Sequence, residues 1–136
     1  MANILLIDDD PLILAYLSRI LQGEGHSVSG VTGGISALAQ YEALRPDLVI
    51  ADVWMPVQDG FETLRAIRKI DPKAKVVTCS GHPSYHGRRL GDVAAECGAS
   101  AFIAKPFSAR QLIDLVNRIL AENGDQPTLV MAGGMA

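Results

Sequence analysis

The stretch Asp47-Leu48-Val49-Ile50-Ala51-Asp52-Val53-Trp54-Met55-Pro56 decides the fold that we expect for this chain. Leu48 to Ala51 form a short apolar run, which is typical of a strand buried on both faces. The run ends at Asp52, and Pro56 and Asp59-Gly60 then turn the chain. A carboxylate there is hard to explain by packing, but open α/β folds bind ligands at the carboxyl ends of parallel strands. We therefore predict that Asp52 is a functional residue.

The bulk composition favours one soluble globular domain over the other broad classes of protein. A chain of 136 residues with 49% hydrophobic residues can bury a packed core without disulfides or metals. Two cysteines, Cys79 and Cys97, lack metal-ligand spacing and are too few for a disulfide scaffold. The formal net charge of −3 argues against a nucleic-acid surface, which needs a clustered basic face. The run Ile4 to Ile7 is too short for a signal sequence or membrane span, so we predict a cytoplasmic protein without membrane contact.

Apolar runs of strand length alternate with segments of helical periodicity along the chain. The predicted strands are Ile4–Ile7, Ser27–Val31, Leu48–Ala51, Val76–Cys79 and Ala101–Ala104. The predicted helices run from Pro11 to before Gly23, from Ile35 to Leu44, from Phe61 to Ile70, over roughly the second half of His82–Gly98, and from Ser108 to Leu120. Five strand–helix units predict an α/β fold, a doubly wound five-stranded parallel sheet flanked by five helices.

Shorter signals set the helix starts and the limits of the domain. Asp10 precedes a proline and is predicted to cap the first helix, and Ser108 is predicted to cap the last. The segment 82–91 contains a proline and two glycines, and we leave its conformation open. We predict one domain over residues 1–122 and a flexible tail over 123–136, because the tail has three glycines and no periodicity.

Four of the predicted strands end in side chains that can take part in chemistry. The first strand is followed by Asp8 and Asp9, the third by Asp52, the fourth by Ser80 and the fifth by Lys105. Because the carboxyl ends of parallel strands share one edge of the sheet, three carboxylates, a hydroxyl and an ammonium group are expected to converge there.

The chemistry of that set favours phosphoryl transfer. Clustered carboxylates repel one another and their pKa values rise unless a cation neutralises them. Hard oxygen ligands suit Mg²⁺, which typically takes one or two carboxylates and a phosphate oxygen. Asp52 would then stay ionised and nucleophilic, while Lys105 and Ser80 could contact phosphoryl oxygens. The expected product is an acyl phosphate on Asp52.

These motifs resemble those of receiver domains of two-component response regulators, the CheY-like family. The matching segments are Leu5 to Pro11, Asp47 to Pro56 with Asp59-Gly60, Ser80-Gly81, and Gly98-Ala99 with Lys105-Pro106-Phe107. Each segment alone is a weak signal. Together they follow the order of the family, each at a strand end, over about residues 3–122.

The resemblance implies a stand-alone signalling switch rather than an enzyme. A histidine kinase or histidine phosphotransfer protein would donate the phosphoryl group to Asp52. Mg²⁺ would be held by Asp9, Asp52 and the backbone carbonyl of Trp54, with Asp8 acting mainly through water. The resemblance also implies a flavodoxin-like strand order of 2-1-3-4-5.

The switch implied by the resemblance involves Ser80 and Phe102. Ser80 would move toward the phosphoryl group while the ring of Phe102 changes rotamer. The face made by the fourth helix, the strand Ala101–Ala104 and the fifth helix would then bind a downstream protein.

Two alternatives use the same residues. The chain could be a docking module of the same fold that works without phosphorylation. Alternatively, Asp8-Asp9-Asp10 fits the Asp-x-Asp start of haloacid-dehalogenase-like phosphatases. That family needs a later acidic pair after another strand, whereas Asp125 follows a helix and a glycine, and Asp52 is left unexplained.

Overall fold

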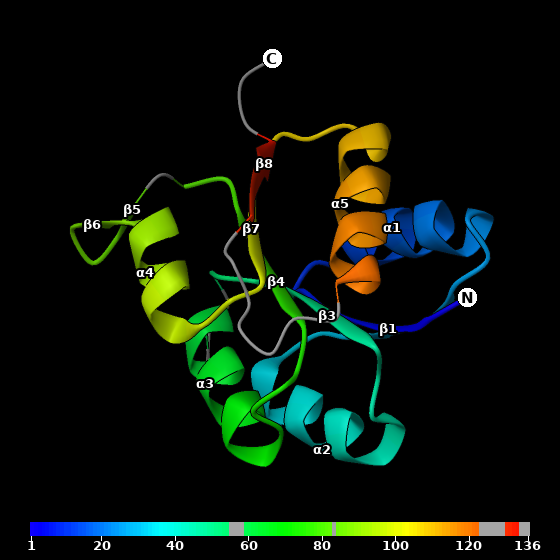
Figure 1. Cartoon of the computed structure of the whole chain (residues 1–136), viewed down its shortest axis with the longest axis horizontal. Helices are drawn as coiled ribbons and strands as arrows, with labels where there is room; N and C mark the ends of the chain where they lie inside the picture. The colour runs from blue at the N-terminus through cyan, green and yellow to red at the C-terminus, as the bar shows by residue number, and fades with distance from the viewer. Residues whose placement is uncertain (55–58, 83, 123–129, 134–136) are drawn as a thin grey trace.

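A six-stranded parallel sheet forms the centre of the computed structural model, which describes residues 1–54, 59–82, 84–122 and 130–133 (Figure 1). Its strands are β1 (Asn3–Ile7), β2 (Ser27–Val31), β3 (Leu48–Asp52), β4 (Val76–Ser80), β7 (Ala101–Ala104) and β8 (Val130–Gly133). They lie in the order β2-β1-β3-β4-β7-β8, and every neighbouring pair is parallel. The predicted order of the first five strands is confirmed.

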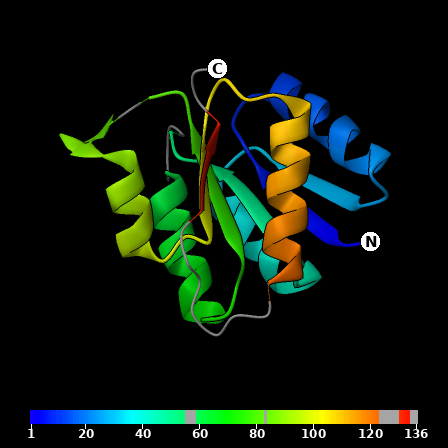
Figure 2. The ribbon, with the colours of Figure 1, turned by 45° about the horizontal axis from the view of Figure 1, so that its top comes forward.

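Five helices cover the two faces of the sheet, as predicted (Figure 2). On one face lie α1 (Pro11–Gly23) and α5 (Ala109–Ala121), and on the other lie α2 (Gly34–Leu44), α3 (Gly60–Ile70) and α4 (Leu90–Cys97). Alternate side chains of β1 enter the two cores, because successive residues of a strand point to opposite faces. All five residues of β3 are buried, which explains its unbroken apolar run. None of the described helices is long and apolar enough to span a bilayer.

Side-chain caps fix the start of three helices. The carboxylate of Asp10 accepts a hydrogen bond from Leu12 N at 2.9 Å, and Ser108 forms a capping box with Gln111. Both caps were predicted. Asp59, which the sequence marks only as a turn residue, caps α3 by accepting from Glu62 N at 2.8 Å.

Gly60 allows α3 to begin close to the end of β3. A Cβ atom at this position would clash with the backbone carbonyl oxygen of Asp52. The amide of Gly60 donates to the carbonyl of Val53 at 2.9 Å, so the turn is closed by the backbone. The close approach explains why a glycine is required here and holds the end of β3 in place.

The segment left open by the sequence contains a short hairpin. Its strands are β5 (Ser84–Tyr85) and β6 (Arg88–Arg89), which pair antiparallel. Between them, His86 and Gly87 have φ values of 49° and +81°, a left-handed turn that glycine adopts readily. Helix α4 starts directly after β6, so its predicted place in the second half of 82–98 is confirmed.

The C-terminal segment differs from the predicted flexible tail, because residues 130–133 form β8. This strand pairs with β7 from Ala101 opposite Val130 to Ala104 opposite Gly133. Without it, β7 would be an edge strand with unpaired backbone groups. Four residues, the last of them a glycine, give too short a signal for prediction from sequence. Residues 123–129 and 134–136 lie outside the described part, and the domain boundary at 122 stays a prediction.

Removal of residues 123–136 should destabilise the domain and expose β7. Loss of the β7–β8 pairing removes a few backbone hydrogen bonds, which we expect to lower the unfolding free energy by about 1–2 kcal/mol and Tm by about 5 °C. The exposed edge should also promote self-association at high concentration. Thermal unfolding and light scattering measure both effects, and a chain ending at Gly133 is the control. Equal Tm values for the two shortened chains would contradict a stabilising role for β8.

Candidate functional site

Three carboxylates meet at the carboxyl edge of the sheet. Asp8 directly follows β1, Asp9 comes next, and Asp52 is the last residue of β3. One carboxylate oxygen from each residue lies within 4.8 Å of the others. Asp8 and Asp52 are buried, with 4% and 7% of their surface exposed, whereas Asp9 is exposed to solvent. The three groups that the strand pattern was expected to bring together therefore form one cluster, open to solvent on the side of Asp9.

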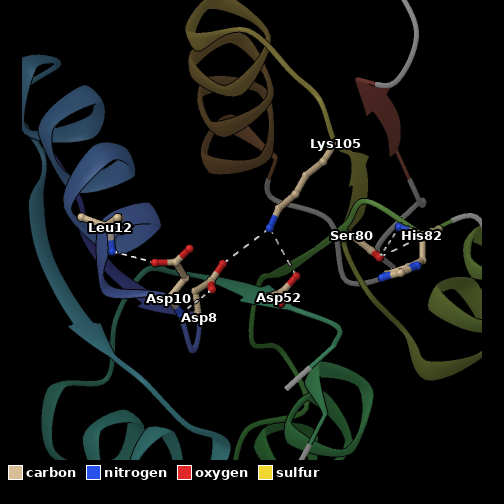
Figure 3. A network of polar contacts seen from close by, with 7 residues as sticks. All are labelled: Asp8, Asp10, Leu12, Asp52, Ser80, His82 and Lys105. Carbon is tan, nitrogen blue, oxygen red and sulfur yellow. Dashed lines mark hydrogen bonds and ion pairs between the residues drawn. The ribbon is translucent and has the colours of Figure 1, made fainter. Parts of the chain in front are cut away.

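Lys105 reaches into this cluster from the end of β7 (Figure 3). Its Nζ atom lies 3.5 Å from Oδ1 of Asp52 and 3.6 Å from Oδ2 of Asp8. The backbone amide of Lys105 donates to the carbonyl of Ser80 at 2.8 Å, and the Lys105–Pro106 peptide bond is cis. The lysine thus lies between two buried carboxylates, where a single ammonium group faces three negative charges.

Burial dominates the electrostatics of the carboxylates. It raises the pKa of Asp52 from 3.8 to about 6; the charge of Lys105 opposes this shift and the charge of Asp8 adds to it. Burial also raises the pKa of Asp8, against a hydrogen bond from the backbone of Asp10 and the charge of Lys105. Lys105 alone therefore leaves the negative charge of the cluster under-compensated.

The cluster has the properties of a site for a hard divalent cation. Oδ1 of Asp8 accepts from Asp10 N at 2.9 Å, but its buried Oδ2 accepts no hydrogen bond from any described residue. The Nζ atom of Lys105 lies 3.6 Å from this oxygen but is shared with Asp52, so a further cation would stabilise the buried carboxylates. Three oxygen ligands from carboxylates, one of them exposed, fit Mg²⁺, which retains several waters. The part of Trp54 in this set, through its backbone carbonyl, stays a prediction.

Ser80 lies on the same edge but does not contact the carboxylates. It is the last residue of β4 and is buried, and its Oγ atom accepts a hydrogen bond from His82 N at 3.0 Å. Figure 3 shows this hydroxyl turned toward His82, beside the loop that follows β4. Phe102, on the next strand, is buried in the core beneath α2, α3 and α4. The predicted movements of Ser80 and Phe102 stay predictions.

Comparison with known proteins identifies the family. The profile described as "Response regulator receiver domain" matches residues 4–117, most of the chain. The chain is a member of the response regulator receiver family. This match favours the receiver family over the phosphatase alternative.

Two of the relatives are similar in length to this receiver, and a third is longer. Protein CcdB of Bacillus subtilis is 36% identical over 121 residues, covering 88% of this chain and 98% of the relative. Chemotaxis protein CheY of Thermotoga maritima is 32% identical over 118 residues, covering 86% and 96%. The DNA-binding response regulator MtrA of Mycolicibacterium smegmatis is 32% identical over 132 residues, and the receiver spans only 56% of it.

Solved structures agree with the fold. The receiver superposes on chemotaxis protein CheY4 of Vibrio cholerae with a TM-score of 0.80 at 30% identity, covering 88% of this chain and 98% of the other. It superposes on a CheY-like receiver domain protein of Methanospirillum hungatei with a TM-score of 0.81 at 29% identity, covering 88% and 94%. In each comparison most of this chain and most of the other chain are superposed, so the similarity extends over the whole domain.

An aromatic cluster beside the receiver's carboxylates was not predicted from the sequence. The ring centroid of Trp54 lies 5.5 Å from those of His82 and Tyr85, and Tyr85 packs edge-on against Phe61 at 4.9 Å. The hydroxyl of Tyr85 donates to Oδ2 of Asp59, the residue that caps α3. The hairpin β5–β6 is thereby fixed beside Trp54, two residues beyond Asp52. No periodic pattern in the sequence marks Tyr85, because a two-residue strand is too short to show one.

The metal-free receiver should lose stability as the pH rises through the titration of Asp52. Because burial raises the pKa of Asp52 from 3.8 to about 6, its protonated form favours folding below pH 4, and this contribution is lost as pH rises through about 6. A shift of two pKa units corresponds to a change in the free energy of unfolding of at most roughly 3 kcal/mol. Urea unfolding in EDTA between pH 4 and pH 7 measures how the free energy of unfolding depends on pH. Asp52→Asn should weaken this pH dependence and leave the part that comes from Asp8, whose pKa is also raised by burial. An unchanged pH dependence in this variant would contradict the assignment.

Proposed function

We propose that this receiver accepts a phosphoryl group on Asp52 from a phosphohistidine of a histidine kinase or histidine phosphotransfer protein. The observation that carries the proposal is the cluster of Asp8, Asp9 and Asp52 with the Nζ atom of Lys105 between two of them. A carboxylate oxygen of Asp52 would attack phosphorus while the bond from phosphorus to the histidine nitrogen breaks. The imidazole leaves with that electron pair, and an acyl phosphate remains on Asp52.

The neighbours of Asp52 fit supporting roles in this step. Lys105 lies 3.5 Å from the carboxylate, so its ammonium group can pair with an oxygen of the incoming phosphoryl group. Asp9, Asp52 and the backbone carbonyl of Trp54 would hold Mg²⁺, with Asp8 acting through water. When bound, the ion neutralises charge on the carboxylates and on the phosphoryl group.

We propose that phosphorylation shifts the receiver between two arrangements of the loop after β4. The hydroxyl of Ser80 now accepts one local hydrogen bond from His82 N, a contact that it can exchange for a phosphoryl oxygen. Movement of Ser80 would let the ring of Phe102 change rotamer. Such a switch requires only that the acyl phosphate binds one arrangement better than the other.

The proposed output face consists of α4, β7 and α5, and β8 forms part of it here. β8 pairs with the outer edge of β7 and lies between α4 and α5 (Figure 1). A downstream protein that binds this face would therefore contact β8. The match covers 98% of Protein CcdB and 96% of chemotaxis protein CheY, so in these two relatives the receiver makes up almost the whole protein. We therefore propose a stand-alone regulator whose downstream partner is a protein.

Intact-mass measurement after incubation with Mg²⁺ and a small acyl-phosphate donor tests the proposal. One phosphoryl group per chain is the expected product, and no incorporation from any donor would overturn it. Capture of a partner with and without a beryllofluoride mimic then separates the switch from the docking alternative. Capture that does not depend on beryllofluoride would favour a docking module that works without phosphorylation.

A further inference from the structure

A groove outside the carboxylate cluster lies between α3, α4 and the hairpin β5–β6. In Figures 1 and 2, α4 lies beside both α3 and the hairpin. The groove has a volume of about 580 Å³. Its lining consists of Arg65, Arg68, Lys69, Tyr85, His86, Arg88, Val93, Glu96 and Cys97. The carboxylates of the proposed phosphorylation site do not line it, so it is a separate feature of the surface.

Positive charge is concentrated in this groove, although the chain as a whole has a net charge of −3. Four arginine or lysine residues line it, against one glutamate that already pairs with Arg88. Arg65, Arg68 and Lys69 follow a spacing of three and four residues, which places them on one face of α3. Neither Arg65 nor Lys69 forms an ion pair with any carboxylate of the described part. Arg68 and Lys69 lie in the last turn of α3, where positive charge favours the helix dipole, but like charges at this spacing also repel one another slightly.

Arg68 is a second residue of the groove whose positive charge is incompletely balanced. Its Nη1 atom donates to the carbonyl of Pro72 at 2.7 Å, and its Nη2 atom donates to the carbonyl of Gly98. Its Nε atom is buried and has no hydrogen-bond acceptor among the described residues. Burial lowers the pKa of Arg68, and the nearby Tyr41 and Asp71 oppose this shift only in part. This half-buried guanidinium group donates hydrogen bonds only to neutral carbonyls among the described residues, and a further anion nearby would stabilise it.

The groove also has an apolar floor, which distinguishes it from a site for a small anion. Val93 is buried, and Tyr85 and Cys97 are half-buried beside it. Arg65 lies over this floor, with its Nη1 atom 3.2 Å from Sγ of Cys97. The exposed cations come from two elements, α3 and the hairpin, rather than converging on one point. A ligand that matches this surface has an apolar side chain between separated negative charges.

We propose that this groove binds an acidic peptide segment of a protein partner. An apolar side chain of the segment would occupy the floor, and neighbouring carboxylates would pair with Arg65 and Lys69, which lie one turn apart on α3. Tyr85 lines the groove and also contacts Trp54, so the site adjoins the proposed phosphorylation site through one side chain. Binding is nevertheless expected from the unphosphorylated chain, and the inference does not depend on phosphoryl transfer.

Fluorescence anisotropy with a labelled peptide tests the inference. The probe has a central leucine flanked by glutamates, and its two comparison peptides carry glutamines in place of the glutamates or serine in place of leucine. The receiver should bind the probe at low salt, more weakly as salt is added, and should prefer it over both comparison peptides. The double variant Arg65→Gln and Lys69→Gln should bind it roughly tenfold more weakly.

A matched double variant controls for net charge. Arg19→Gln with Arg118→Gln removes two exposed arginines from α1 and α5, on the other face of the sheet, and should leave binding unchanged. Circular dichroism confirms that both double variants fold. Equal losses in the two would mean non-specific attraction and overturn the proposal. Absence of binding at low salt would overturn it too, as would full competition by tripolyphosphate with no preference for leucine, which would indicate a small-anion site.

Discussion

Asp52→Asn should abolish phosphoryl incorporation by this receiver. An amide in place of the carboxylate cannot form an acyl phosphate, and neither neighbouring carboxylate occupies the same place. Asp8 is tied by a hydrogen bond to the backbone of Asp10, and Asp9 is exposed at the rim of the cluster. After incubation with Mg²⁺ and a small acyl-phosphate donor, intact mass should show one added phosphoryl group on the wild type and none on the variant.

A second Asp→Asn substitution makes this experiment specific. Asp10 caps α1, and asparagine is an equally good cap, so Asp10→Asn should fold and accept a phosphoryl group like the wild type. Asp52→Asn should also fold, because it removes a carboxylate that burial makes unfavourable. Incorporation into folded Asp52→Asn would place the acceptor elsewhere, with Asp9 the first candidate. Loss of incorporation in Asp10→Asn would mean that the effect is not specific to Asp52.

Most of the fold could be predicted because its strands are buried on both faces. β3 and β4 have only buried residues, and such runs stand out from the helical segments between them. The hairpin and β8 could not be predicted in this way. The two-residue strands of the hairpin are too short to show a periodic pattern of apolar residues. β8 has no such pattern either and is defined by its pairing with β7. The tail prediction was therefore wrong at the four residues that depend on a distant strand.

The charged residues of the candidate site were easier to predict than its polar and aromatic contacts. Topology alone places the ends of β1, β3 and β7 at one edge, so the meeting of Asp8, Asp52 and Lys105 follows from the order of strands. The direction of a side chain does not follow from topology. Ser80 hydrogen-bonds to the loop that follows it, because a serine at the end of a strand can satisfy a nearby backbone amide. Similarly, Tyr85 contacts Asp59 only because an irregular loop folds back on α3.

Removal of divalent cations should prevent phosphoryl incorporation in the wild type, and added Mg²⁺ should restore it. Without a cation, three carboxylates face one ammonium group, and an incoming phosphoryl group would add further negative charge. Asp9→Asn removes the exposed carboxylate while leaving both buried ones in place. We expect it to weaken Mg²⁺ binding by roughly a hundredfold or more, since even outer-shell changes weaken metal binding by about 10–100-fold.

Trp54 offers a measure of this binding that does not depend on phosphorylation. It is the single tryptophan of the chain and lies two residues beyond Asp52, so its fluorescence should change as Mg²⁺ binds. Titration of wild type, Asp9→Asn and Asp10→Asn should give a much higher Kd for Asp9→Asn alone, because Asp10 is occupied in capping α1. If Asp9→Asn and wild type bound Mg²⁺ equally, Asp9 would not be a ligand. If neither protein bound it, the buried oxygen of Asp8 that accepts no hydrogen bond would need another explanation.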